Sequence, residues 1–187
     1  MKKYLLTAAV AAAAFVTAAP TAVGAPAAHP ADARPAASAA PAAAGTPAVS
    51  PSPIEVVRPG ERIDAGKGWT VWLTRQGKHW AGEDGAENFR SVVDGNIDLS
   101  APGVSHQSEG DADGVFHSGI FYGTHRAGRV ELTEADGTKT VAALLSLPGR
   151  PGWGVWYAHT PPAEGGSAVA LYDREGRLLA DLPAWDR

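Results

Sequence analysis

Two pairs of tryptophans have a spacing that could present aromatic rings to a ligand. Trp69 and Trp72 are three residues apart, as are Trp153 and Trp156, and both pairs lie among residues that favour strands. Because side chains alternate between the two faces of a strand, Trp72 would point away from the core that Trp69 joins, and Trp156 would do the same in its own strand. Exposed indoles stack on sugar rings or anchor protein partners. We therefore predict that Trp72 and Trp156 bind a ligand.

Trp80 joins this predicted ligand-binding set from a segment that reads as a loop. Two alternatives remain open for the paired tryptophans. Loops could cover the outward rings as a second small core, or a bulge at Gly154 could turn both rings of its pair to one face. Trp80 fits either interpretation.

An acidic segment follows, with oxygen ligands at alternate positions. Glu109, Asp111 and Asp113 precede Gly114, which resembles the opening of a calcium-binding loop. The twelfth position of that loop would be Ile120, where a bidentate glutamate is expected, so the match is partial. An acidic surface turn between strands explains the same pattern. We predict Glu109, Asp111 and Asp113 as ligands of calcium, and no other cofactor is expected.

Histidines near this acidic turn raise the alternative of a small hydrolase. His106 and His117 flank the turn, and with its carboxylates they could form a zinc site or an acid–base site. The sequence contains neither Gly-x-Ser-x-Gly nor His-Glu-x-x-His. A pocket that joins His106 or His117 with a carboxylate and a serine would favour catalysis. Separations beyond about 10 Å would oppose catalysis, because proton transfer needs hydrogen-bond reach or one bridging water.

Composition excludes several function classes. The chain has 187 residues, a net charge of −4 and no cysteine. It therefore has no disulfides, thiolate zinc sites or cysteine nucleophiles. The acidic balance argues against nucleic-acid binding, which requires a basic surface. A chain of this length is expected to form one domain, or at most two small ones.

The elements that must position these residues are short strands. Gly-containing turns separate runs of β-branched and aromatic residues throughout residues 54–187, which predicts an all-β domain. An antiparallel β-sandwich is the first choice and a small β-barrel is the alternative. Three hairpins are predicted, at Asp94-Gly95, Asp136-Gly137 and Glu175-Gly176. The predicted strands span residues 55–57, 69–74, 89–93, 96–99, 115–122, 129–133, 138–145, 154–159, 169–172 and 178–181.

The segments before this domain read as a leader and a spacer. Residues 1–25 have two lysines, an apolar run and a small-residue cleavage site, which is typical of a secretory signal peptide. An uncleaved N-terminal anchor is the alternative. Residues 26–53 are rich in Ala and Pro and are predicted to be a disordered linker. We expect a secreted, extracellular protein without a membrane anchor after signal cleavage. The linker could tether the domain across a cell-wall layer, or could have no task.

The segment from residue 129 to residue 182 reads RVELTEADGTKTVAALLSLPGRPGWGVWYAHTPPAEGGSAVALYDREGRLLADL. It resembles a recurring all-β segment of uncharacterised secreted or surface proteins of actinomycetes. The resemblance implies an extracellular β domain, and it carries over no active-site residues because none are established for such segments. From the signal peptide, the linker, the turn-rich β domain and the outward tryptophans we expect a non-catalytic domain that binds an extracellular or cell-wall ligand, either a polysaccharide or another secreted protein. The small hydrolase is the alternative function.

Overall fold

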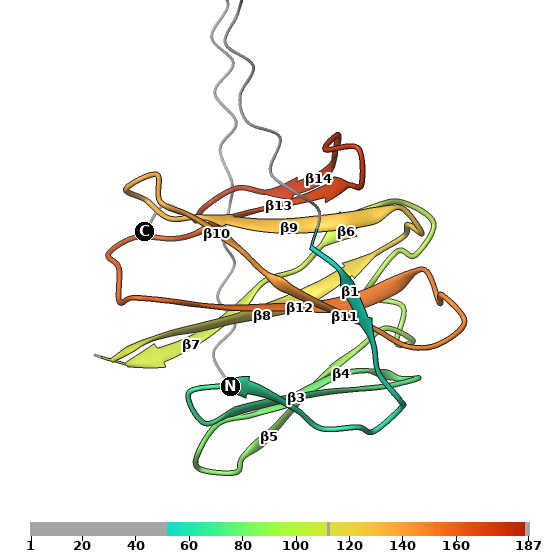
Figure 1. Ribbon diagram of the computed structural model, residues 1–187, viewed down its shortest axis with the longest axis horizontal. Helices are drawn as coiled ribbons and strands as arrows, with labels where there is room; N and C mark the ends of the chain where they lie inside the picture. The colour runs from blue at the N-terminus through green and yellow to red at the C-terminus, as the bar shows by residue number, and fades with distance from the viewer. Residues whose placement is uncertain (1–51, 112, 186–187) are drawn as a thin grey trace, which may run out of the picture. The chain divides into compact units, whose positions relative to one another are not determined.

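The computed structural model of the chain describes residues 52–111 and 113–185 (Figure 1). The described residues form fourteen strands and no helix, so the prediction of an all-β fold is confirmed. No helix that could cross a membrane occurs among them. The signal peptide expected over residues 1–25 lies outside the described residues, as does nearly all of the linker expected over 26–53.

A central sheet is built from six strands. Its order is β1-β11-β12-β8-β6, and β7 pairs with another part of β8. All its pairs are antiparallel except β1 with β11, which is parallel. The six strands are β1 (Ile54–Val56), β6 (Gly103–Val104), β7 (Gln107–Asp111), β8 (Gly114–Tyr122), β11 (Ala143–Ser146) and β12 (Trp153–Thr160).

Two four-stranded antiparallel sheets accompany the central sheet. The first has the order β2-β3-β4-β5 and the second has the order β10-β9-β13-β14. None of the three sheets closes into a barrel among the described strands, so the barrel alternative is not what forms. The eight strands are β2 (Ile63–Gly66), β3 (Trp69–Thr74), β4 (Gly77–Ala81), β5 (Glu87–Ser91), β9 (Ala127–Thr133), β10 (Lys139–Val141), β13 (Ala168–Asp173) and β14 (Leu178–Leu182).

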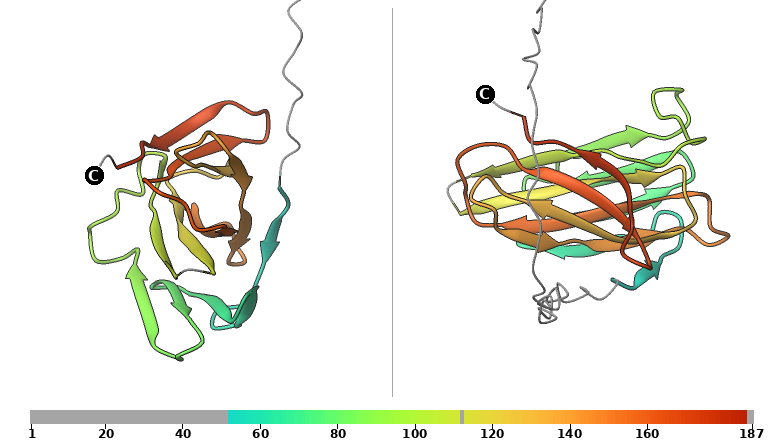
Figure 2. Two further views of the ribbon diagram at one scale, coloured as in Figure 1. Left: turned by 90° about the vertical axis from the view of Figure 1, so that its left-hand side faces the viewer. Right: turned by 90° about the horizontal axis from the view of Figure 1, so that it is seen from above.

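The central sheet packs apolar side chains against a different sheet on each face. Phe116 and Ile120 of β8 belong to a first cluster with Leu73 of β3, whereas Phe121 of β8 belongs to a second cluster with Val130 of β9. This division follows from the alternation of side chains along β8. Figure 2 shows the cyan and green strands of the β2–β5 sheet on one side and the red strands β13 and β14 of the second flanking sheet on the other.

Two of the three predicted hairpins form. Asp136-Gly137 joins β9 to β10, and Glu175-Gly176 joins β13 to β14. The hairpin predicted at Asp94-Gly95 is wrong, because β5 pairs with β4 and residues 96–99 form no strand. The side chain of Asp94 accepts a hydrogen bond from the backbone N–H of Asn96 at 3.1 Å, and this local turn bends the chain away from a hairpin.

Residues 138–145, predicted as one strand, are divided between two sheets. β10 pairs with β9 in the second flanking sheet, and β11 pairs with β12 in the central sheet. The division falls at Ala142, whose backbone N–H donates to the carbonyl of Val130 at 3.0 Å. Ala142 is buried in the second cluster, so this crossing point ties the two sheets together.

Candidate functional site

The predicted outward tryptophans do turn away from the first cluster, but other side chains cover them. Trp156 is 0% exposed within the second cluster, and its Nε1 donates to the carbonyl of Ser105 at 3.0 Å. Gly119, which faces Trp156 on β8, makes this possible because a Cβ there would collide with both groups. Trp156 is therefore covered, as one of the two alternatives expected, but by strands that include β9 and β13 and not by loops alone.

Trp72 lies on the outer face of the β2–β5 sheet and is 5% exposed. The guanidinium of Arg62 lies 3.9 Å from the centre of the indole. His79, its neighbour on β4, stacks on it with centroids 5.2 Å apart, and Phe89 of β5 continues the row. The indole thus has neighbours that already occupy its surface, while Phe89 is 50% exposed at the end of the row.

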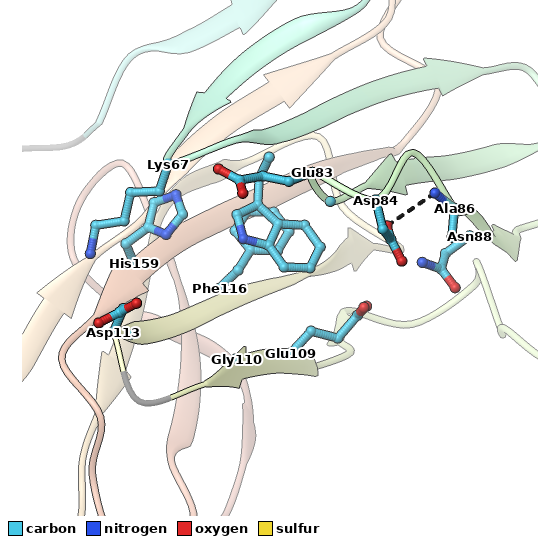
Figure 3. Close-up of a pocket in the computed structure, with 13 residues that line it drawn as sticks. Lys67, Glu83, Asp84, Ala86, Asn88, Glu109, Gly110, Asp113, Phe116 and His159 are labelled. Atoms are coloured by element: carbon cyan, nitrogen blue, oxygen red, sulfur yellow. Dashed lines mark hydrogen bonds between the residues drawn. The ribbon is translucent and has the colours of Figure 1, made fainter.

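A pocket of about 790 Å³ lies between the β2–β5 sheet and the β7–β8 hairpin (Figure 3). Figure 3 shows Glu109 and Asp113 of the hairpin region on one side and Glu83, Asp84 and Asn88 on another. The pocket is lined by Lys67, Trp69, Gly82, Glu83, Asp84, Ala86, Asn88, Glu109, Gly110, Asp113, Gly114, Phe116 and His159. We call it the acidic pocket, because four of these side chains are carboxylates.

Two stacked aromatic rings form the apolar part of the acidic pocket. The partly buried indole of Trp69 stacks on Phe116 with centroids 4.4 Å apart and an interplanar angle of 12°. Gly82 passes the six-membered ring of this indole, and a Cβ on Gly82 would lie 3.3 Å from Cη2 of Trp69. Gly82 can lie this close to the indole because it has no side chain, and Trp69 lines the pocket as a partly buried ring.

Trp80 contacts the acidic pocket through Glu109, one of the residues that line it. Trp80 is 7% exposed and belongs to the first cluster, and its Nε1 donates a hydrogen bond to Oε1 of Glu109. The prediction placed Trp80 in a loop, but it lies in β4. Its contribution to a site is to hold the carboxylate of Glu109, while its own ring is buried.

The residues predicted as calcium ligands do not lie in a loop of the expected kind. Glu109 and Asp111 belong to β7, and Asp113 lies in the tight turn before β8. Residues 107–111 pair with residues 114–118, so the segment is a hairpin. No group of three or more His, Cys, Asp or Glu side chains able to hold a metal ion occurs in the part of the chain that the structure describes.

The β7–β8 hairpin separates two pockets on opposite faces of the central sheet. Glu109 faces Phe116 across the hairpin, and both line the acidic pocket. Ser108 faces His117, the next pair along, and both line a second pocket of about 310 Å³. Alternation along the two strands thus sends neighbouring residues into different pockets. We call the second one the histidine pocket.

A chain of hydrogen bonds runs through the histidine pocket. Nε2 of His106 lies 2.9 Å from Nδ1 of His117, and Nε2 of His117 lies 3.0 Å from Oγ1 of Thr160. The hydroxyl of Thr160 donates to the carbonyl of Pro161 at 3.0 Å, so it accepts the proton of His117. Nδ1 of His117 then accepts from His106. Both imidazoles are neutral in this arrangement.

Burial keeps these histidines neutral. It lowers the pKa of His117 to about 4, and the charges that His106 and His159 would carry lower it further. Burial also lowers the pKa of His106, with a smaller contribution from the ammonium of Lys78. Both groups are therefore poor proton acceptors at neutral pH.

Glu134 and Ser167 complete the histidine pocket. Oγ of Ser167 donates to Oε2 of Glu134 at 3.0 Å, and Oε1 of Glu134 lies 4.0 Å from Nε2 of His117. His106 and His117 were predicted from the sequence, but Glu134, which directly follows β9, was missed. No local motif connects Glu134 to the histidines, because only the packing of the sheets brings them together.

A buried lysine of β4 was also missed. Lys78 is 0% exposed, and its Nζ donates to Oε1 of Gln107 at 2.7 Å and to Oγ of Ser118 at 2.8 Å. The ammonium also lies 3.9 Å from the ring centre of Trp80. Burial lowers the pKa of Lys78 to about 7, an effect that the carboxylate of Glu109 partly opposes.

Comparison of the chain with protein-family models, with curated proteins and with solved structures found no significant match. The function therefore has to be inferred from the geometry of these two pockets.

Proposed function

We propose that this protein is a secreted, non-catalytic module that binds a neutral extracellular or cell-wall glycan in the acidic pocket. The observation that carries the proposal is the partly buried indole of Trp69, which stacks on Phe116 and lines a pocket edged by polar side chains. A fixed aromatic face surrounded by hydrogen-bonding groups suits a sugar ring, which has apolar C–H faces and hydroxyls around its edge.

The polar side chains of the acidic pocket suit hydroxyl groups. Carboxylates such as Asp84 and Glu109 accept two hydrogen bonds each or more, and the amide of Asn88 both donates and accepts. Trp80 fixes Glu109, and the backbone N–H of Ala86 fixes Asp84 at 3.0 Å. A ligand therefore meets acceptors whose positions are already set, which reduces the entropy lost on binding.

The charge of the pocket favours a neutral ligand over an anionic one. Four carboxylates line it against one lysine, Lys67. An acidic polymer would bring like charges together at this surface, which is unfavourable. The pocket volume of about 790 Å³ is within the range of sites for small ligands and has room for more than one sugar ring.

The remaining parts of the proposal come from the sequence. We propose that residues 1–25 direct export, that residues 26–53 act as a linker, and that the domain is a β-sandwich of the kind found in secreted actinomycete proteins. The apolar clusters on both faces of the central sheet support the sandwich assignment. The leader pattern supports export.

Retention on glycans tests this function. We expect Trp69→Ala to reduce retention on insoluble glycans by about tenfold or more, the loss typical of an aromatic stacking residue. Phe89→Ala is the control, since it removes an exposed ring outside the pocket. Equal retention of wild type and Trp69→Ala on every glycan bound would contradict the assignment of the pocket. A protein retained on no glycan would contradict the function itself.

The histidine pocket favours a hydrolase as the second candidate. It brings His106 and His117 together with Glu134 and two serines, which is the combination that catalysis would require. However, Ser167 donates to Glu134, and the acceptor nitrogen of His117 is occupied by His106. No serine hydroxyl bonds to an imidazole among the contacts of the described pocket, so a nucleophile is not activated there.

A further inference from the structure

The histidine pocket contains a buried carboxylate oxygen that has no hydrogen-bond partner. The side chain of Glu134 is 8% exposed. Its Oε2 accepts a hydrogen bond from Oγ of Ser167, but its Oε1 has no partner among the residues that the structure describes. Burying an ionised oxygen without a donor is costly, so a ligand that brings a donor to this oxygen would be stabilised there.

His117 does not donate a hydrogen bond to Oε1 of Glu134. Its Nε2 lies 4.0 Å from Oε1 of Glu134, which is too long for a hydrogen bond, and its N–H already points to the hydroxyl of Thr160 at 3.0 Å. The other nitrogen of His117 accepts from His106. Because both imidazoles are neutral, the described side chains of the pocket carry no positive charge to offset Glu134.

We propose that the histidine pocket binds a primary ammonium group, with Oε1 of Glu134 as its counterion and hydrogen-bond acceptor. An ammonium provides up to three N–H donors and the positive charge that the pocket lacks. A site of this kind lies beyond the neutral-glycan function, because it is on the opposite face of the β7–β8 hairpin.

Other parts of the histidine pocket fit an ammonium carried on a small ligand. The indole of Trp185 lines the pocket and is 75% exposed, so it can place its face next to a cation. The hydroxyls of Ser108 and Thr160 are further acceptors on the pocket wall. The volume of about 310 Å³ has room for one amino sugar or for the side chain of a lysine.

A metal ion fits the pocket less well. Nε2 of His106 and Nδ1 of His117 are hydrogen-bonded to each other at 2.9 Å, so neither is directed at a common third atom. Two protein ligands at most would remain, and structural zinc sites use four. The described residues of this pocket accordingly include no set of side chains arranged to hold a metal.

Calorimetric titration of the full chain at pH 7 tests the proposal and distinguishes the two sources of the ammonium. The probes are glucosamine and Nα-acetyl-lysine amide, and the matched neutral ligands are glucose and Nα-acetyl-norleucine amide. We expect at least one ammonium probe to bind about tenfold more tightly than its neutral counterpart. Glucosamine would indicate an amino sugar, and the lysine derivative would indicate a peptide or protein partner.

Three variants locate the binding. Glu134→Gln keeps an acceptor for Ser167 but removes the charge, and we expect it to weaken ammonium binding by about tenfold or more. Trp185→Ala changes an exposed residue and should weaken binding about threefold. Glu164→Gln removes an exposed carboxylate outside the pocket lining and should leave binding unchanged. Thermal unfolding of each variant shows whether it is folded.

Two results would overturn the proposal: no binding of either ammonium probe at millimolar concentration, or binding that folded Glu134→Gln and Trp185→Ala leave unchanged. The second result would place the ammonium elsewhere, for example in the acidic pocket. Retention on glycans is a separate measurement, so either of the two proposals can fail while the other stands.

Discussion

At the scale of single residues, the most unusual feature is the charged side chain of Lys78, which is buried away from water. Lys78 is fully buried, and the neutral donors and acceptors around its Nζ, Gln107 and Ser118, satisfy its N–H groups without neutralising its charge. The negative charge of Glu109 raises the pKa of Lys78 and so partly opposes the effect of burial. The burial of this ammonium therefore has a free-energy cost that depends on pH.

The pH dependence of stability should reveal Lys78. Its pKa is about 7 in the folded protein against an ordinary value of 10.5, so the unfolded chain binds more protons between these values. Stability should therefore rise with pH across this window, by about 3 kcal/mol between pH 7 and pH 10. Urea unfolding of wild type and Lys78→Met measures this rise as a difference, and the exposed Lys67→Met is the control. Parallel curves for wild type and Lys78→Met would contradict the burial of the charge.

His117 should have an effect of the same sign as Lys78 at lower pH, where stability again rises with pH. Its folded-state pKa of about 4 lies below the ordinary 6.5, so the unfolded chain takes up a proton first as pH falls. Relative to His117→Gln, wild type should lose about 2 kcal/mol of stability between pH 6.5 and pH 4. The titratable groups around it are His106, His159 and Glu134. Chemical unfolding at the two pH values measures the loss, and an equal loss in both proteins would exclude His117 as its source.

At the scale of elements, β8 contributes to pairing, to packing and to both pockets. It pairs with three strands, packs apolar side chains into both clusters and lines both pockets. Gly119 at its centre is required for a close approach, because a Cβ there would overlap the carbonyl of Ser105 and the indole of Trp156. The geometry of this strand therefore limits what its neighbours can do.

Gly119→Ala tests this requirement. The added methyl must displace either backbone or a fully buried indole, and we expect a loss of about 2 kcal/mol or more in the free energy of unfolding. Gly85→Ala is a useful comparison, since Gly85 has a positive φ of 72° and open space around it. That change should cost about 1 kcal/mol of backbone strain without a collision. Guanidinium unfolding ranks the two, and a Gly119→Ala variant as stable as wild type would contradict the close contact.

The sequence predicted those elements whose formation depends on residues adjacent in the chain. The run from Trp69 to Thr74 is a strand with the predicted bounds, and two of three acidic-Gly turns close hairpins. β4 was missed because Lys78 and His79 interrupt its apolar pattern, and a lysine buried by partners from β7 and β8 has no local signature. The same reason hides Glu134. The alternation of side chains predicted which face each tryptophan occupies. That Trp156 is covered follows only from the packing of the second flanking sheet.

At the scale of the molecule, the described strands form one connected structure. Both apolar clusters include side chains of β8 and β12, and the chain crosses from the second flanking sheet into the central sheet at Ala142. Without cysteine, packing and hydrogen bonding must supply the stability. Loss of the central sheet would expose both clusters together.

Amide hydrogen exchange should therefore show one global unfolding transition for all three sheets. The slowest amides of β4 and of β13 lie in different flanking sheets, and we expect their free energies of opening to agree within about 1 kcal/mol. Exchange measured at several urea concentrations provides this comparison. A flanking sheet whose protected amides all exchange through a separate, lower-energy opening would show that the clusters unfold independently.

The hairpin of β7 and β8 also constrains how this chain can change over generations. Its odd and even positions line different pockets, so inserting or deleting one residue between Glu109 and the turn would move the β7 side chains to the opposite pockets. The carboxylate of Glu109 would then turn toward the imidazoles, and a serine would face the stacked rings. Substitutions in this hairpin can adjust one pocket at a time, whereas a shift in length remodels both at once.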